Sequence, residues 1–137
     1  MSNRVSICSA APWEKQVGYC RAVRVGNLVA VSGTAPVSDA GELVAPGDPY
    51  GQARRCIEVI ANALAEAGCG LQDVYRTRMF VTDIEHWPEI GRAHMEAFGK
   101  VPPAATMVEV SRLITPGMLV EIEADAWLPA DDRAPEQ

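Results

Sequence analysis

The feature that most constrains the fold is the C-terminal stretch KVPPAATMVEVSRLITPGMLVEIEADAW, residues 100–127. It predicts two apolar strands joined by a turn at residues 115–117, where Pro and Gly break regular structure. In the second strand, Glu121, Glu123 and Asp125 are two residues apart. Side chains of a strand alternate between its faces, so all three carboxylates must point to one side. The chain is therefore expected to build a sheet with a carboxylate-bearing strand.

Length and composition favour one ordinary globular domain. The chain has 137 residues, of which 48% are hydrophobic and 22% charged, typical values for a single core. No apolar run reaches the roughly 20 residues of a membrane span. The first 16 residues lack the apolar region of a secretory signal, which predicts a cytosolic protein. We expect one domain over residues 1–128 and a disordered polar tail over residues 129–137.

The residue types that commonly bind metals or nucleic acids are few or scattered along this chain. The four cysteines form no C-x-x-C pair, and His86 and His94 are eight residues apart, so we predict no metal and no cofactor. The net charge is −6 and the isoelectric point about 4.8, which disfavours a nucleic-acid partner. Several arginines could still form a local basic patch, but a surface mixed with acids is the preferred interpretation: Arg21, Arg24, Arg54, Arg55, Arg76 and Arg78.

The first half of the chain predicts a hairpin followed by a helix. Residues 21–33 contain two β-rich runs around Gly26-Asn27, a dipeptide suited to a two-residue turn. Asp48 can cap a helix that begins at Pro49. Apolar residues then recur at three- and four-residue steps until the glycines at positions 68 and 70 end the helix. The expected buried stripe consists of Ala53, Cys56, Ile57, Ile60, Ala61 and Leu64.

The second half predicts a strand, a helix and the two final strands. Residues 73–83 alternate and are rich in β-formers, and Gly99 ends the following helix, whose stripe is Trp87, Ile90, His94, Ala97 and Phe98. The order β-β-α-β-α-β-β, with hairpins at both ends, predicts an α+β fold with two helices on one face of a mixed sheet. The other face then lacks cover. Such a face usually meets a partner chain, so we expect a homo-oligomer.

Three segments together resemble the Rid family of reactive-intermediate deaminases, also called the YjgF family. They are GYCRAVRVGNLVAVSGTAP, GQARRCIEVIANALAEAGCGLQDVYRTRMFVTD and PPAATMVEVSRLITPGMLVEIEADAW. The resemblance covers about residues 16–128. It implies a chorismate-mutase-like fold, a homotrimer and clefts between subunits. It also implies hydrolysis of enamines or imines, with a motif arginine that grips the substrate carboxylate, a glutamate that positions water and a tyrosine that lines the cleft.

Carried onto this chain, the resemblance assigns the catalytic role to Glu121 and a substrate-binding role to Tyr19. The P-A-R-[ST] motif reads Pro103-Ala104-Ala105-Thr106, so the arginine is replaced by alanine. A cysteine common in relatives is replaced by Met107, and an asparagine by Gly91. The predicted substrate-binding residues are Tyr19, Ala105, Thr106, Met107 and Gly91.

The missing arginine restricts the substrate. Each charge-assisted bond of a guanidinium to a carboxylate contributes roughly 1.5–3 kcal/mol. Loss of two such bonds weakens binding of a 2-imino acid by about two orders of magnitude or more, at ~1.4 kcal/mol per tenfold. Two alternatives stay open. In the first, Arg78 or Arg112 supplies the positive charge, although surface solvation or an ordinary ion pair is the expected state of both. In the second, the substrate is neutral or cationic and needs no such charge.

We therefore expect a small-molecule hydrolase that acts on an enamine or imine, with weak or no activity on the usual 2-imino acids. A non-catalytic ligand-binding or regulatory trimer is the first alternative, and an endoribonuclease the second. Glu121, Glu123 and Asp125 could also be an ordinary exposed strand face, and Tyr19 a packing aromatic. Cys20 has no neighbouring His or Lys to lower its pKa, so a buried, inert thiol is expected there.

Overall fold

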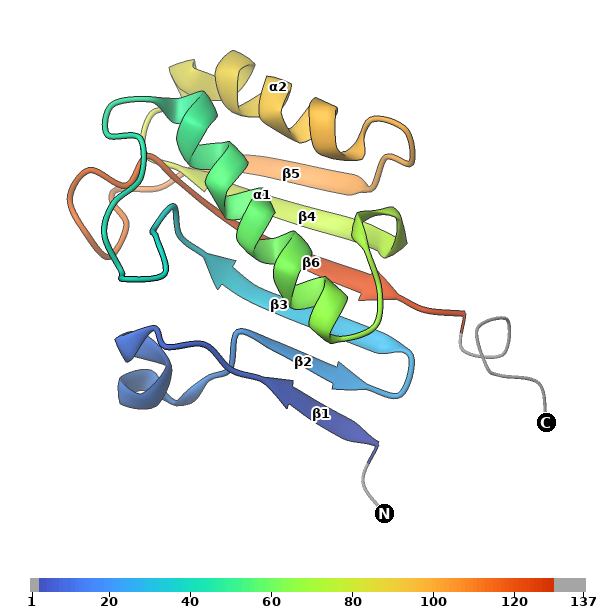
Figure 1. Cartoon of the computed structure of the whole chain (residues 1–137). Helices are drawn as coiled ribbons and strands as arrows, with labels where there is room; N and C mark the ends of the chain where they lie inside the picture. Colours follow the sequence, from blue (N-terminus) through green and yellow to red (C-terminus); the bar gives the residue numbers. More distant parts are fainter. Residues whose placement is uncertain (1–2, 130–137) are drawn as a thin grey trace.

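The computed structural model describes residues 3–129, which form one six-stranded sheet with two α-helices on one face (Figure 1). The strands are β1 (Arg4–Ile7), β2 (Ala22–Val25), β3 (Leu28–Thr34), β4 (Val74–Val81), β5 (Ala104–Glu109) and β6 (Val120–Trp127). The helices are α1 (Pro49–Glu66) and α2 (Trp87–Phe98). A short π-helix, η1, spans Glu14–Gly18. The predicted tail, apart from its first residue, lies outside the described residues.

The sheet confirms the predicted α+β class, and its strands lie in the order β1-β2-β3-β6-β4-β5. The predicted hairpin between the last two strands is wrong. β5 pairs in parallel with β4 at the sheet edge, and β6 lies between β3 and β4. Helix α2 connects β4 to β5, and such a crossover is what a parallel pair requires. β1 was not predicted: Val5 and Ile7 alternate with Arg4 and Ser6, but a run of four residues is too short to stand out as a strand.

Both helices begin and end as their local sequence predicts. Asp48 caps α1, where its Oδ1 accepts a hydrogen bond from the amide N of Gly51 at 3.0 Å, and Pro49 follows at the first position. In α2, Ile90 and Phe98 are buried against the sheet. Trp87 is 60% exposed, so its place in the predicted buried stripe is wrong. Helical spacing predicts only the direction in which a side chain points, whereas its burial depends on which part of the protein lies opposite.

Strand β6 shows the two faces of the sheet most clearly. Val120, Ile122, Ala124 and Ala126 are at most 1% exposed, and they face α1 and α2. The residues between them, Glu121, Glu123 and Asp125, are half-buried on the opposite side. We call this side the open face, because within residues 3–129 no helix covers it (Figure 1).

The open face also carries exposed apolar side chains at one end. Val25, Leu28 and Trp127 are 44%, 50% and 48% exposed. The strand register pairs Val25 with Leu28 and Leu28 with Trp127. Paired residues of neighbouring strands share a face, so the three side chains form one patch beside the carboxylates of β6.

Candidate functional site

The carboxylate of Glu121 lies between two neighbouring strands on the open face. Phe80 of β4 is its register partner on one side. Gly33 of β3 lies on the other side, where a β-carbon would overlap the Glu121 carboxylate. The register of β3 against β6 shifts between Val31 and Thr34. A bulge of this kind redirects side chains, and here it lets the glycine backbone approach the acid.

Arg21, just before β2, brings a positive charge to this place. Its Nη2 donates a hydrogen bond to the carbonyl O of Gly33 at 2.5 Å, and its side chain is only 11% exposed. Its Nη1 lies 4.0 Å from Oε2 of Glu14, and its guanidinium carbon lies 5.7 Å from the centre of the Tyr19 ring. Arg21 therefore connects Tyr19 to the backbone that contacts Glu121.

The segment before Arg21 is held by a buried acid. Glu14 is 5% exposed and accepts a hydrogen bond from the amide N of Ser9 at 2.9 Å. The Ser9 hydroxyl donates to the other carboxylate oxygen of Glu14. The amide N of Tyr19 donates to the backbone O of Glu14 at 3.0 Å. These bonds fix the turn that presents Tyr19 and Arg21.

Burial raises the pKa of Glu121 above its ordinary value, and the negative charge of Glu123 adds to this rise. The Arg21 cation acts in the opposite direction and favours the ionised form. Between residues 3 and 129, no hydrogen-bond donor contacts the Glu121 carboxylate. Water or a second subunit would have to supply any donors to this carboxylate.

Arg78 is engaged by two acids of β6 in this arrangement. Its Nη1 lies 3.1 Å from Glu123 and 3.3 Å from Asp125, on the open face. The ion pair expected for Arg78 is therefore found. Arg112 is exposed in the connection between β5 and β6, where residues 111–119 and Thr82 line a shallow hollow.

The predicted substrate-binding residues of β5 do not share one face. Thr106 is the register partner of Arg78 and lies on the open face. Ala105 and Met107 pair with Thr77 and Met79, whose side chains face the helices. The alternation of an edge strand separates them.

Gly91 lies on α2, across the sheet from Glu121. Within one chain, the structure associates Tyr19 with the surroundings of Glu121 and leaves Gly91, Ala105 and Met107 on the helix side. One chain therefore does not bring these predicted residues together at Glu121.

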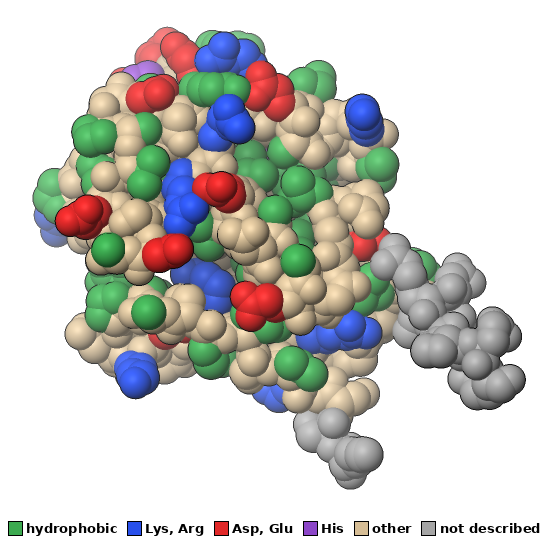
Figure 2. All heavy atoms as spheres, viewed as in Figure 1, with side chains coloured by type: hydrophobic (Ala, Val, Ile, Leu, Met, Phe, Trp, Pro, Cys, Tyr) green, Lys and Arg blue, Asp and Glu red, His purple; other side chains and the backbone are tan. Residues whose placement is uncertain are grey.

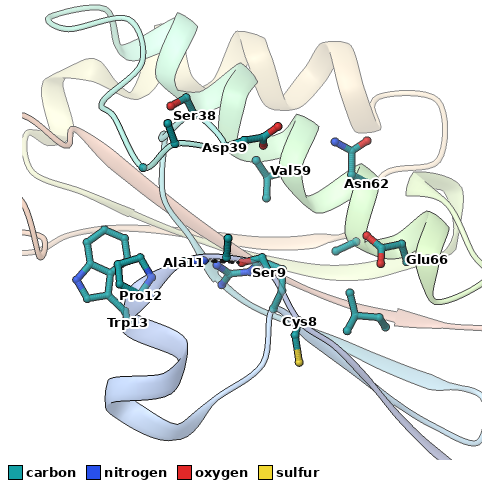
Figure 3. A pocket seen from close by; sticks show the side chains of 16 residues that line it. Cys8, Ser9, Ala11, Pro12, Trp13, Ser38, Asp39, Val59, Asn62 and Glu66 are labelled. Atoms are coloured by element: carbon teal, nitrogen blue, oxygen red, sulfur yellow. Dashed lines mark hydrogen bonds between the residues drawn. The ribbon is translucent and has the colours of Figure 1, made fainter.

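A separate pocket of about 340 Å³ lies on the helix side, between α1, residues 7–13 and residues 38–41. Figure 3 shows Val59, Asn62 and Glu66 projecting from α1 toward Ser9, Ala11 and Pro12. Arg21 contributes to its wall. On this side of the molecule, Lys and Arg side chains alternate with Asp and Glu (Figure 2), which agrees with the mixed surface predicted from the sequence.

Residues 3–129 lack both a membrane-spanning helix and a metal-binding cluster. No helix there is both long and apolar enough to cross a membrane. Histidine, cysteine and acidic side chains also fail to gather in groups of three or more that could hold a metal ion.

Sequence reasoning missed Arg21, Glu14 and Gly33. Arg21 was visible only as one of several scattered arginines, and nothing near Glu14 indicated burial. Gly33 had a signal, because a glycine near the end of a strand often marks a bulge or a close approach of backbone.

The mixed six-stranded sheet with two helices on one face is the architecture of the chorismate-mutase-like α+β class. The family model described as Endoribonuclease L-PSP matches residues 9–128. The chain therefore belongs to this family, which includes the YjgF and Rid proteins. A crystal structure of a YjgF/YER057c/UK114 family member from Mycobacterium tuberculosis is similar, with 48% identity and a TM-score of 0.83 over 91% of this chain and 99% of that one.

Two further relatives bear on function. The 3-aminoacrylate deaminase RutC from Acinetobacter baylyi is 34% identical over 79% of this chain and 85% of its own length. The structure of TdcF from E. coli with bound serine has 28% identity and a TM-score of 0.75, over 90% of this chain and 93% of that one.

Proposed function

We propose that this protein hydrolyses a reactive enamine or imine with a water molecule positioned by Glu121. The observation that carries the proposal is the half-buried Glu121 carboxylate, which lies against Gly33 and is influenced by the Arg21 cation. The similarity to a 3-aminoacrylate deaminase supports the reaction class. Within residues 3–129 this carboxylate accepts no hydrogen bond, which suits it to hold water.

The chemistry needs little beyond placement of water and movement of protons. An enamine first becomes an imine by protonation at carbon. Water then adds to the imine carbon while Glu121 accepts a proton from it. Glu121 passes this proton to nitrogen, the hydroxyl proton of the adduct follows it as the carbon–nitrogen bond breaks, and the products are a carbonyl compound and ammonia. Because the imine carbon is already electrophilic, orientation of water supplies much of the rate.

Arg21 acts in this scheme as a positioning residue. Its charge favours the ionised form of Glu121, which is the form that accepts a proton. Its hydrogen bond to the Gly33 carbonyl holds the backbone beside the acid. Tyr19, which lies against Arg21, would line the substrate side of the same place.

The substrate we favour is neutral or cationic. Ala105 supplies no guanidinium, Arg78 is engaged by Glu123 and Asp125, and Glu121 and Glu123 repel an anion. We expect weak or absent activity on 2-aminoacrylate-type imino acids, and Ala105→Arg is expected to raise it. A wild-type rate equal to that of an arginine-bearing relative, assayed side by side, would show that another residue binds the carboxylate.

We further propose that the protein acts as a homotrimer with each cleft between two subunits. The support is the apolar patch of Val25, Leu28 and Trp127 on the open face. A second support is the position of Ala105, Met107 and Gly91, which lie away from Glu121 within one chain.

A non-catalytic, ligand-binding trimer is the second candidate, favoured by the similarity to a structure with bound serine. Such a protein would be stabilised by a ligand without forming product. The endoribonuclease in the family model's name is a weaker candidate, because a net charge of −6 opposes binding to a polyanion.

The test compares Glu121→Gln with Glu123→Gln while ammonia release is followed from imines generated in situ, with neutral, cationic and carboxylate-bearing substrates. Glu121→Gln keeps the shape but loses the charge, so it should lose about 100-fold or more of kcat, within the usual range for general acid–base catalysis. Glu123→Gln should stay within a few-fold of wild type. Normal turnover by Glu121→Gln would reject the mechanism, whereas stabilisation by a substrate without product would favour the ligand-binding alternative.

A further inference from the structure

Two cysteine thiols face each other at the base of the segment that carries Glu14 and Tyr19. The Sγ atoms of Cys8 and Cys20 are 3.9 Å apart. Cys8 is exposed and Cys20 is half-exposed, so the burial expected for Cys20 is not found. Cysteines that pack in a core are not usually found as an exposed pair. This arrangement therefore points to chemistry between the two sulfur atoms.

The backbone explains why these sulfur atoms meet. β1 and β2 are antiparallel, and their register ends with Ile7 opposite Ala22. Cys8 follows directly on one side, and Cys20 lies just before β2 on the other. The hydrogen bonds between β1 and β2 therefore hold both ends of the segment that connects these strands, independently of the segment's own conformation. Figure 3 shows the Cys8 sulfur directed away from α1, where a small reagent can reach it.

We propose that Cys8 and Cys20 form a reversible intrachain disulfide that closes residues 8–20 into a covalent loop. A disulfide needs a sulfur–sulfur distance of about 2.05 Å, so the two atoms must approach by roughly 1.9 Å from their present separation. Rotation about the side-chain bonds of an exposed cysteine, with a small shift of the segment, can supply such a movement. This proposal stands independently of the proposed hydrolase function.

The chemistry balances with a peroxide or a small disulfide as the oxidant. With hydrogen peroxide, the Cys8 thiolate attacks an oxygen atom, the O–O bond breaks, and a sulfenic acid and water form. The Cys20 sulfur then attacks the Cys8 sulfur, the S–O bond breaks, and a second water leaves. Two thiols and one peroxide thus give one disulfide and two waters, and a thiol reductant reverses the change.

The surroundings predict how fast the bond forms. The pKa of Cys8 is raised, first by its hydrogen bond with Cys20 and by the charge of Cys20, with a smaller effect of the Glu14 charge. The thiolate is the reactive form, so oxidation should be slow at neutral pH and faster as pH rises. The pair therefore suits a slow response to sustained oxidation better than a role as a rapid peroxide sensor.

The closed loop would restrain residues that contact the candidate site. Tyr19 and Arg21 flank Cys20 directly, and Glu14 lies inside the loop. Closing a loop of about 13–15 residues removes freedom from the unfolded chain. The oxidised protein should therefore have a higher Tm than the reduced protein, unless strain at the new bond offsets the gain.

The sequence allows an unambiguous test by tryptic mapping. Lys15 is the one trypsin site between the two cysteines, so Cys8 falls in peptide 5–15 and Cys20 in peptide 16–21. Cys56 and Cys69 share peptide 56–76, so another pairing gives a different mass. Purified protein would be incubated with hydrogen peroxide or oxidised glutathione, its remaining thiols blocked, and the digest compared with and without reductant.

We expect the thiols to fall from four to two and peptides 5–15 and 16–21 to appear as one disulfide-linked species. Cys8→Ser and Cys20→Ser should each abolish this species and the rise in Tm. Cys69→Ser, a matched control elsewhere in the chain, should retain both. Persistence of four thiols, a disulfide between two chains, or separate oxidation of Cys8 without a link to Cys20 would each overturn the proposal.

Discussion

The two faces of the sheet differ in how completely one chain satisfies them. On the helix side, alternate residues of β6 are almost fully buried, and Gln52 of α1 bonds to backbone groups of Ala45, Gly117 and Leu119. On the open face, half-buried carboxylates and the Arg78 side chain that pairs with them lie beside exposed apolar side chains. Within residues 3–129 the helix side forms a packed core, whereas the open face has the mixed apolar and charged composition of an interface with another chain.

This difference follows from strand geometry. Each residue of β6 that supports the core is next to one that serves the open face, so Ile122 lies between Glu121 and Glu123. A shift of one residue would bury the acids and expose the core, which makes the register strongly specified. The faces can nevertheless be perturbed separately by substituting neighbouring residues.

The largest expected effect is on the helix side. Ile122 is fully buried, so Ile122→Ala should lower the free energy of unfolding by about 2–5 kcal/mol. The measurement is urea unfolding at a fixed protein concentration. Its neighbour supplies the control, since Glu123→Ala removes a partly exposed ion pair and should cost about 1 kcal/mol or less. Equal costs at the two positions would contradict the difference between the faces.

On the open face, the largest effect should be on assembly. Leu28→Glu places a charge in the apolar patch, and if the assembly buries Leu28 between subunits, loss of that burial costs roughly 1.5–3 kcal/mol. Subunit dissociation should therefore increase by about tenfold or more in sedimentation measurements, while circular dichroism stays native. Val5→Glu, an equally exposed apolar position on β1, should leave the assembly intact. A matching loss with both variants would mean that general surface charge is responsible.

A smaller effect concerns the pH dependence of activity. Arg21 favours the ionised form of Glu121, so Arg21→Gln should raise the Glu121 pKa further. Turnover needs the ionised carboxylate and is lost as pH falls through its pKa, so the acidic limb of the kcat/KM profile should move to higher pH. Arg21→Lys keeps the charge and should leave the limb closer to wild type. An unchanged acidic limb in Arg21→Gln would show that Arg21 does not influence the pKa of Glu121.

The smallest effect is on stability at Glu121 itself. Its pKa is raised in the folded state, so its contribution to stability is present at low pH and is lost as pH rises through the folded pKa. Glu121→Gln should therefore slightly raise Tm at neutral pH, and the gain should shrink as pH falls toward the ordinary range of glutamate. A lower Tm for the variant at neutral pH would contradict the burial cost assigned here.

Much of the fold could be predicted from the sequence because it depends on local signals. The Asp48 cap, Pro49, the apolar stripe of α1 and the alternation of β4 each act within a few residues. Strand neighbours are not local. Nothing in the stretch of residues 100–127 indicates that β6 lies between β3 and β4 while β5 lies at the edge.

The candidate site could be predicted in part for the same reason. Alternation placed Glu121 on the same face as Glu123 and Asp125, which the structure confirms. The approach of Arg21 and Gly33 depends on a bulge between Val31 and Thr34 and on a turn held by buried Glu14. These contacts join separate segments, and no spacing in the sequence encodes them.

The central claim is that the open face is completed by other copies of the chain, and the mass of the protein in solution tests it most directly. Sedimentation velocity and equilibrium at micromolar concentration should give one species of three times the 14.7 kDa chain mass. That result, together with dissociation by Leu28→Glu, would support a site shared between subunits. A wild-type protein that sediments as a 14.7 kDa monomer would contradict the assembly and the cleft built upon it.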